Sequence, residues 1–236
     1  MEQKYQIDWK RTVHLFKVGI FASLMVLAGD MLLGWGVCDP KATGLPPMLS
    51  RYLSVSDDRI YASALLGLIG IPIECLCWFA IYRVIRAYSE KDAHAYRSGI
   101  IGCLAFGGCG AHVPCCMAAW LLKRFYTGDT QVLLEKFGSW LIWFLLPATG
   151  IFMIFFFLTI IVQLKAFLKG HSPFPGWCAI FSLSFGFLFV ILMRMIGDYA
   201  FANALATGWI SIGNLWMNAG LLIMSEKEMA RCSGIR

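Results

Sequence analysis

Three side chains that are able to carry out acid–base chemistry lie inside apolar stretches of this sequence. They are Asp30 in AGDMLLG, Glu74 in GIPIECL and His112 in GGCGAHVP. Carboxylates and imidazoles are the usual general acids and bases of enzymes. An ionisable group in an apolar segment is expensive, so it commonly marks a polar interior or a functional site. We therefore take Asp30, Glu74 and His112 as candidate catalytic residues; the alternative for Glu74 and His112 is a structural, hydrogen-bonded interior group.

A fourth charged group, Arg194, stands in the apolar run VILMRMIGD, and Asp198 follows four residues later. On a helix, this spacing places both side chains on one face. A guanidinium in such a segment needs a cavity or a carboxylate. Two interpretations stay open. Arg194 pairs with Asp30 as a structural ion pair that orients two helices, or it helps to fix the anionic head group of a substrate.

Further polar residues extend the list of candidate substrate-binding groups. Arg59 stands at the start of an apolar segment, and Asn214 and Asn218 are four residues apart, on one face of a helix. Asparagines in this arrangement commonly bond neighbouring helices. The predicted substrate-binding residues are Arg194, Asp198, Arg59, Asn214 and Asn218.

One constellation has the residue types of a metal site. Cys109, His112 and Cys116 are spaced i, i+3 and i+7, and thiolates and imidazoles bind zinc or copper. A fourth ligand is missing, however, and Pro114 distorts this turn. Cysteine also packs well as a small apolar residue. We therefore predict no metal and no cofactor. The sequence also lacks a Gly-rich phosphate loop with its Lys, HExxH and GxSxG.

Composition shows what must position these residues. The chain is 59% hydrophobic and only 14% charged, whereas soluble domains carry about 25% charged residues. Its apolar segments are about 20 residues long, the length that a bilayer span requires. We predict an all-α, polytopic integral membrane protein built as one six-helix bundle. The spans are expected at about 16–38, 60–82, 98–122, 140–164, 177–196 and 205–224, between an N-terminal segment 1–15 and a tail 225–236. The charged stretch 83–97 is expected to be solvent-exposed.

Basic residues predict the orientation. Six of the 20 Lys and Arg residues fall on the side away from the termini, and Arg194 lies within the fifth span; the other thirteen fall on the side of the termini. These six are Lys41, Arg51, Arg59, Lys123, Arg124 and Lys136. Cytoplasmic loops are richer in Lys and Arg, so both termini are expected in the cytoplasm. The compact chain suggests the cytoplasmic (inner) membrane of a prokaryote. No basic run interleaved with aromatics occurs, so nucleic acid is not an expected partner.

The topology converts sequence position into depth, at about 1.5 Å per helical residue. Asp30 then lies in the outer half of the membrane, His112 near the middle and Glu74 in the inner half. Polar groups from several spans at related depths predict one polar cavity that opens outward. The expected partners are membrane lipids, with an amphiphilic small molecule as ligand.

Two family resemblances point in the same direction. The GDMLL of residues 29–33 resembles the Gly-Asp-x-Leu-Leu element of lysoplasmalogenase-type membrane hydrolases, over one helical turn, with Asp198 as a loose candidate for the companion acidic motif. The combination of carboxylate, His, Asn and Trp resembles, in residue types only, the sterol isomerases of the emopamil-binding kind. Both resemblances imply amphiphilic substrates.

Function therefore divides into two main hypotheses. The first is a small intramembrane enzyme that acts on a lipid or other amphiphile, with Asp30, Glu74 and His112 as acid–base groups and Arg194 as an anchor for an anionic head group. The alternative is a proton- or cation-coupled transporter or permeability protein, which the inner position of Glu74 favours. A membrane scaffold subunit with structural ion pairs is a third possibility.

Overall fold

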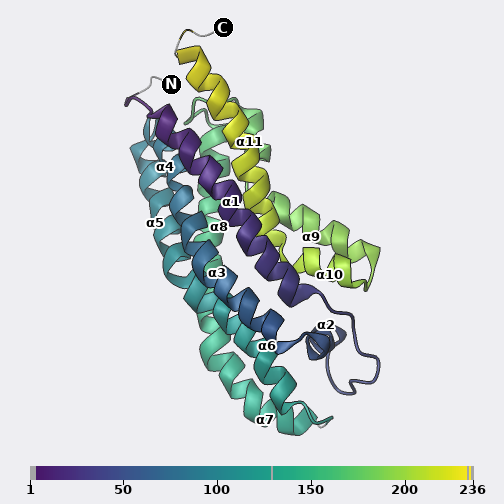
Figure 1. Ribbon diagram of the computed structural model, residues 1–236. Helices are drawn as coiled ribbons and strands as arrows, with labels where there is room; N and C mark the ends of the chain where they lie inside the picture. Colours follow the sequence, from purple (N-terminus) through teal and green to yellow (C-terminus); the bar gives the residue numbers. More distant parts are fainter. Residues whose placement is uncertain (1–3, 129, 233, 235–236) are drawn as a thin grey trace.

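The computed structural model describes residues 4–128, 130–232 and 234, and these residues form helices and connecting turns without a β-strand. Figure 1 shows a long bundle in which α1 begins and α11 ends at the same end of the molecule. The α-helices are α1 (Trp9–Gly34), α2 (Pro47–Ser50), α3 (Asp57–Cys77), α4 (Phe79–Arg86), α5 (Glu90–Phe106), α6 (Val113–Phe125), α7 (Thr130–Trp140), α8 (Leu146–Leu168), α9 (Phe185–Ile196), α10 (Ala200–Thr207) and α11 (Trp209–Cys232). Short 3₁₀ or π-helical segments join some of them: η1 (Arg51–Ser54), η2 (Gly107–His112), η3 (Leu141–Leu145) and η4 (Gly176–Ile180).

Four helices among the described residues are long and apolar enough to cross a membrane. They are Trp9–Gly34, Asp57–Arg86, Glu90–Phe125 and Gln131–Leu168. This confirms the prediction of an all-helical protein with apolar, membrane-length helices. The helices extend beyond the predicted spans because their polar ends continue the helical turns. α1 starts at Trp9, for example, where Asp8 caps the helix by accepting a hydrogen bond from the Arg11 amide at 2.9 Å.

The last two predicted spans differ from the observed helices. The segment 177–196 is not one helix, since η4 and a non-helical stretch precede the 12-residue α9. This irregular backbone passes close to α11: a Cβ added at Gly213 would lie 2.7 Å from the Leu183 carbonyl oxygen. The segment 205–224 is interrupted at Gly208, and α11 runs on to Cys232. The six-span count and the orientation therefore stay predictions.

The helix α1 packs against α3 on one side and α11 on the other. Glycines allow these close approaches, because an added Cβ at Gly70 would lie 2.4 Å from Val26 and one at Gly19 would lie 2.7 Å from Asn218. The helix α5 packs along α8 in the same way, with Gly102 against the ring of Phe155. Glycines thus allow close helix packing in α5 as well.

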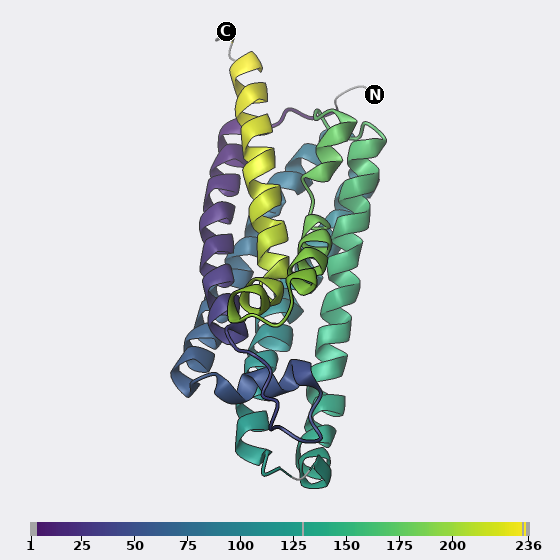
Figure 2. The same cartoon turned by 90° about the vertical axis from the view of Figure 1, so that its right-hand side faces the viewer.

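The helices α9 and α10 project from the side of the bundle and turn back into α11 (Figures 1 and 2). Gly197 ends α9 with a φ of 107°, a conformation that favours glycine. Asp198 therefore lies in the turn after the helix, which corrects the prediction that it shares a helical face with Arg194. The Asp198 carboxylate instead accepts a hydrogen bond from the Cys38 amide at 2.8 Å, joining this turn to the loop after α1.

Candidate functional site

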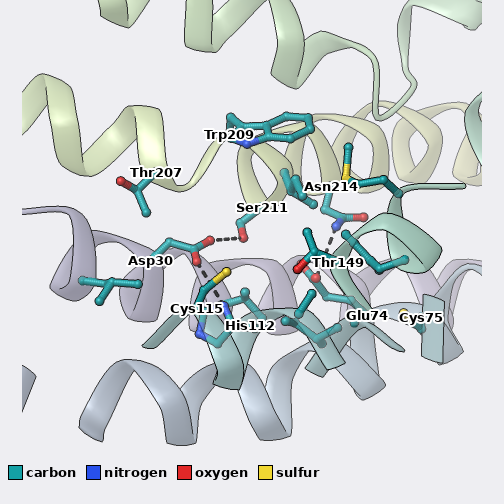
Figure 3. A pocket seen from close by; sticks show the side chains of 18 of the residues that line it. Asp30, Glu74, Cys75, His112, Cys115, Thr149, Thr207, Trp209, Ser211 and Asn214 are labelled. Carbon is teal, nitrogen blue, oxygen red and sulfur yellow. Dashed lines mark hydrogen bonds and ion pairs between the residues drawn. The ribbon is translucent and has the colours of Figure 1, made fainter. Parts of the chain in front are cut away.

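A cavity of about 290 Å³ lies in the bundle between α1, α3, α6, α8 and α11. Asp30, Glu74 and His112 all line it, and so does Asn214 (Figure 3). The structure thus brings together the three side chains predicted as acid–base groups, from three separate helical segments. The remaining lining is largely apolar and aromatic, and includes Trp209 and Phe152. An apolar cavity with a few convergent polar groups is the usual form of a small-molecule site.

Asp30 and His112 form the first polar contact in the cavity. The Asp30 Oδ1 atom lies 3.5 Å from His112 Nδ1, while Asp30 Oδ2 accepts a hydrogen bond from the Ser211 hydroxyl at 2.7 Å (Figure 3). Both side chains are about nine-tenths buried. The carboxylate is thereby held by α11 on one side and faces the imidazole on the other.

The second ring nitrogen of His112 fixes where its protons lie. Nε2 is 3.0 Å from the backbone carbonyl oxygen of Ser63. A carbonyl oxygen only accepts hydrogen bonds, so Nε2 carries a proton in this contact. Nδ1 is therefore the atom that gains or loses a proton, and it is the atom that faces Asp30 (Figure 3). This is the tautomer arrangement of a general base or acid whose orientation is set by a backbone group.

Local sequence explains why the imidazole reaches the cavity. His112 ends the π-helical segment η2, which is rich in glycine and is followed by Pro114. Proline has no N–H to continue the regular ladder, and single π-helical turns commonly occur at functional sites. On the facing helix α3, an added Cβ at Gly67 would lie 2.0 Å from His112 Cδ2. Gly67 therefore leaves the space that the ring occupies.

Glu74 forms the second polar centre of the cavity. Its Oε2 accepts a hydrogen bond from Asn214 Nδ2 at 3.2 Å, and Asn214 Oδ1 accepts one from the indole N–H of Trp78 at 2.7 Å. The Glu74 side chain is buried, and Oε1 lacks a hydrogen bond of ordinary geometry within the described residues. The hydroxyl of Ser23 on α1 also interacts with this carboxyl group. Glu74 is thus contacted by α11 through Asn214 and lies beside α1 in the interior of the bundle.

Buried polar groups continue from Glu74 along the contact between α1 and α11. Asn218 Nδ2 donates a hydrogen bond to the Ser23 hydroxyl at 3.4 Å, and both side chains are fully buried. We call Glu74, Asn214, Ser23 and Asn218 the polar seam. Asn218 lies in this seam rather than in the lining of the cavity. Its predicted role as a direct substrate contact is therefore not supported by its position.

The other predicted binding residues lie outside the cavity. Arg59 Nη2 donates to the carbonyl oxygen of Trp35 at 3.0 Å, at the junction of α1 and α3. Arg194 donates to Asn203 Oδ1 at 3.3 Å. The predicted ion pair between Asp30 and Arg194 is thus wrong. The helix α9 turns away from the bundle, which the sequence did not reveal. The two Asp30 oxygens contact His112 and Ser211 instead.

A second polar cluster occurs where α9 and α10 meet the loop after α1. Arg51 and Arg194 both donate to Asn203 Oδ1, and Asn203 Nδ2 donates to Asp198 Oδ1 at 2.6 Å. We call Arg51, Arg194, Asn203 and Asp198 the arginine cluster. The hydrogen bond from Asn203 holds the pKa of Asp198 below its usual value. The Cys38 amide adds to this effect by donating to the same carboxylate.

Cys109, His112 and Cys116 do not converge. Cys109 is exposed, and the Cys116 thiol lies 3.5 Å from the Ser63 hydroxyl. The π-helical segment changes the register that would have placed the three on one face. Among the described residues there is no group of three His, Cys, Asp or Glu side chains able to hold a metal ion.

Several residues of the site were missed at the level of sequence. Ser63 holds the His112 ring from outside the lining, Ser211 holds Asp30, and Trp78 holds Asn214, the partner of Glu74. Trp78, Ser211, Thr149 and Cys115 line the cavity. Serine, threonine and tryptophan are common in apolar helices, so their types alone give no functional signal. Cys115 was visible only as one of several cysteines in its span.

Comparison with known proteins identifies a family. The model of a protein family described as "Family of unknown function (DUF6796)" matches residues 1–228. No curated protein and no solved structure matches the chain.

Proposed function

The chain belongs to the DUF6796 family of unknown function, and from its cavity we propose that it is an intramembrane enzyme that acts on a lipid or another amphiphile by acid–base chemistry. The observation that carries the proposal is the contact of Asp30 with His112 Nδ1 inside a largely apolar cavity. The four apolar helices support a membrane location. The excess of basic residues on the side of the termini supports a cytoplasmic membrane with both termini inside.

In this proposal His112 transfers the proton. Its Nε2–H stays bonded to the Ser63 carbonyl, so a proton taken from the substrate is held at Nδ1, in the contact with Asp30 Oδ1, and is returned to the substrate from there. Asp30 stabilises the imidazolium that forms and keeps the ring oriented, while Ser211 keeps the carboxylate in place. Glu74, held by Asn214 farther along the same cavity, supplies a second acid or base group.

The size and lining of the cavity indicate the class of ligand. A volume of about 290 Å³ is near the lower end for small-molecule sites, which span roughly 300–1,000 Å³. The aromatic and aliphatic side chains of Trp209, Phe152 and Ile71 suit an apolar portion. The polar groups along α1, α3 and α11 suit a hydroxyl, ester or carbonyl. We therefore expect the cavity to take one segment of an amphiphile rather than a whole two-chain lipid.

Proton-coupled transport is the second candidate, and the polar seam is the observation that favours it. The seam leads from Glu74 through Ser23 to Asn218 within the α1–α11 contact. Buried chains of carboxylates and polar side chains in membrane helices commonly serve as proton relays. A transporter requires access from both ends, whereas an enzyme requires only one open side.

The experiment is a time course in vesicles made from the total lipids of the expression host. The purified wild-type protein and a His112→Asn variant are reconstituted side by side, and all lipids are quantified by mass spectrometry. We expect one lipid or amphiphile to be consumed by the wild type. Loss of a general acid–base group typically costs about 10²–10⁴-fold in rate, so the variant should show almost no turnover.

The same vesicles separate the two candidates. An internal pH dye records proton flux under an imposed pH gradient, and a Glu74→Gln variant provides the matched test of the seam. Lipid turnover without proton flux supports the enzyme. Proton flux that requires Glu74, without any lipid change, contradicts the enzyme and supports transport. If both signals are absent for wild type and variants, the chain is better described as a scaffold subunit.

A further inference from the structure

We propose that the arginine cluster is a binding site for the phosphate group of an anionic phospholipid. None of its four residues lines the cavity of Asp30, Glu74 and His112. This lipid site depends on the membrane location that is part of the proposed function, but it does not depend on any chemistry in that cavity.

Arg51 is the first reason. Its side chain is only 4% exposed, and its Nη1 donates to Asn203 Oδ1 at 3.2 Å. Its Nε is buried and lacks a hydrogen-bond partner in the described part of the chain. A buried guanidinium with an unused donor is costly, because each unpaired polar group has given up its bonds with water. A ligand with several acceptor oxygens would remove this cost.

The second reason is that two guanidinium groups converge on one neutral oxygen. Arg194 Nη1 donates to the same Asn203 Oδ1 at 3.3 Å. Neither arginine lies within ion-pair distance of a carboxylate among the described residues. Asp198 is near enough to act on both charges, but its two oxygens already accept bonds from Asn203 and from the Cys38 amide.

Two cations and one anion leave a positive charge uncompensated in the arginine cluster. Arginine is the side chain that best matches the oxygens of phosphate, because its N–H donors form a planar fork. Two such forks meeting at one point therefore indicate a phosphate group as the ligand.

The surroundings indicate that the phosphate belongs to a lipid. Arg194 sits on α9, which projects from the bundle (Figure 1). This helix exposes a series of large apolar side chains. These side chains are Leu188, Ile191, Leu192 and Met195. The arginine cluster lies at the level where α1 ends, which is where head groups lie if α1 spans the membrane. An acyl chain can then lie along α9 while its phosphate contacts Arg51 and Arg194.

The test is a lipid titration of the full-length protein in detergent, followed by native mass spectrometry. Phosphatidylglycerol, which is anionic, is compared with phosphatidylcholine, which is zwitterionic. We expect the wild type to retain one phosphatidylglycerol at least about tenfold more tightly than phosphatidylcholine. Arg194→Gln should lose this preference by about tenfold or more, the usual size of a lost charge-assisted hydrogen bond.

Three further variants keep the test independent of folding and of net charge. Lys41→Gln removes the same charge from the exposed loop after α1 and should bind as the wild type does. Arg194→Lys and Arg51→Lys keep the charge but lose the fork, so each should bind with intermediate affinity.

The outcomes are distinct. If Arg194→Gln and Lys41→Gln both bind phosphatidylglycerol like the wild type, the proposal is overturned, and equal binding of the two lipids by the wild type also overturns it. If inorganic phosphate at the same concentration displaces phosphatidylglycerol from the wild type, the phosphate site is confirmed and its ligand is free phosphate. Because the measurement involves no turnover, it is unaffected by whether the cavity proves to be an enzyme site.

Discussion

Two contacts between an aspartate and a histidine occur in the described part of the chain, and their surroundings differ. In the cavity, Asp30 Oδ1 lies 3.5 Å from His112 Nδ1, and its other oxygen accepts a bond from a neutral serine. Near the end of the bundle where the chain begins and finishes, Asp92 lies 2.6 Å from His171 Nδ1, and its other oxygen lies 2.5 Å from Lys165 Nζ.

The difference between the two contacts assigns them different roles. Asp92 on α5 is 3% exposed and joined to two basic side chains from α8 and the turn after it. Its two oxygens bind basic side chains and it does not line the cavity, so its role is to tie helices together. Asp30 and His112 form a longer contact that faces a cavity. Residue types alone do not distinguish a structural pair from a chemical one, whereas the neighbouring groups do.

The largest predicted effect on stability comes from breaking the closed contact. Asp92→Asn should lower the free energy of unfolding by about 3 kcal/mol, because it leaves the Lys165 and His171 side chains without a counter-charge. This loss of unfolding free energy is at the low end of the range for breaking a buried ion pair, because the Lys165 side chain is 41% exposed to solvent. Thermal unfolding in detergent measures it.

The matched variant is Asp30→Asn. An asparagine oxygen still accepts the Ser211 bond, so stability should fall by only about 1 kcal/mol. If Asp30→Asn destabilises the protein as much as Asp92→Asn does, both contacts are structural and the comparison fails.

The next effect tests the space that holds the imidazole. Gly67→Ala should cost about 1–3 kcal/mol, because the added Cβ would meet His112 Cδ2 at 2.0 Å and push the ring away from Asp30. Gly150→Ala on α8 is the control. No atom lies within 4 Å of its added Cβ, so this change should be neutral or stabilising by up to about 1 kcal/mol. Equal behaviour of the two variants would mean that the ring tolerates displacement.

A smaller effect concerns access to the cavity. Cys115 and Cys232 are both exposed, but Cys115 lines the cavity whereas Cys232 lies away from it, at the end of α11. A small apolar thiol reagent should modify Cys115 several-fold more slowly when a ligand fills the cavity, while the rate at Cys232 stays constant. Peptide mass spectrometry measures both rates in one sample. Unchanged modification of Cys115 would show that the ligand binds elsewhere.

The smallest effect is a pH dependence at Asp198. Hydrogen bonds lower the pKa of Asp198 in the folded protein. The Asp198 carboxylate therefore contributes its full stabilisation at any pH above its unfolded pKa of about 3.9. This stabilisation is lost as the pH falls through the lowered pKa of the folded protein. The Cys38 amide, which bonds to this carboxylate, should stay protected from hydrogen exchange between pH 7 and 5, after correction for the intrinsic rate, and lose protection in stronger acid. Loss of protection already between pH 7 and 5 would point to another titrating group.

Part of this architecture was predictable from the sequence. Apolar segments of bilayer length predicted the helices. The rare ionisable residues within these segments singled out Asp30, Glu74 and His112, and the three side chains line one cavity. The three groups share one cavity because the cost of burying a charge is so high that few charges occur without a partner, and their catalytic role stays a prediction.

The remaining features depend on contacts that a linear pattern does not contain. One of the two interpretations of Arg194 paired it with Asp30, but α9 turns away from the bundle and Arg194 contacts Asn203 instead. Asp92 was expected in a solvent-exposed stretch, yet Lys165 and His171 bury it from positions more than 70 residues away. Partners so distant in sequence are set by tertiary packing.

The most direct test of the central claim compares the two aspartates in the lipid-turnover assay, with rates normalised to folded protein. The account predicts that Asp30→Asn loses about 100-fold or more in rate, because the imidazole loses the carboxylate that stabilises its charged form. Asp92→Asn should keep a rate close to that of the wild type. Equal losses in both variants, or no loss in Asp30→Asn, would contradict the claim that the Asp30–His112 contact performs the chemistry.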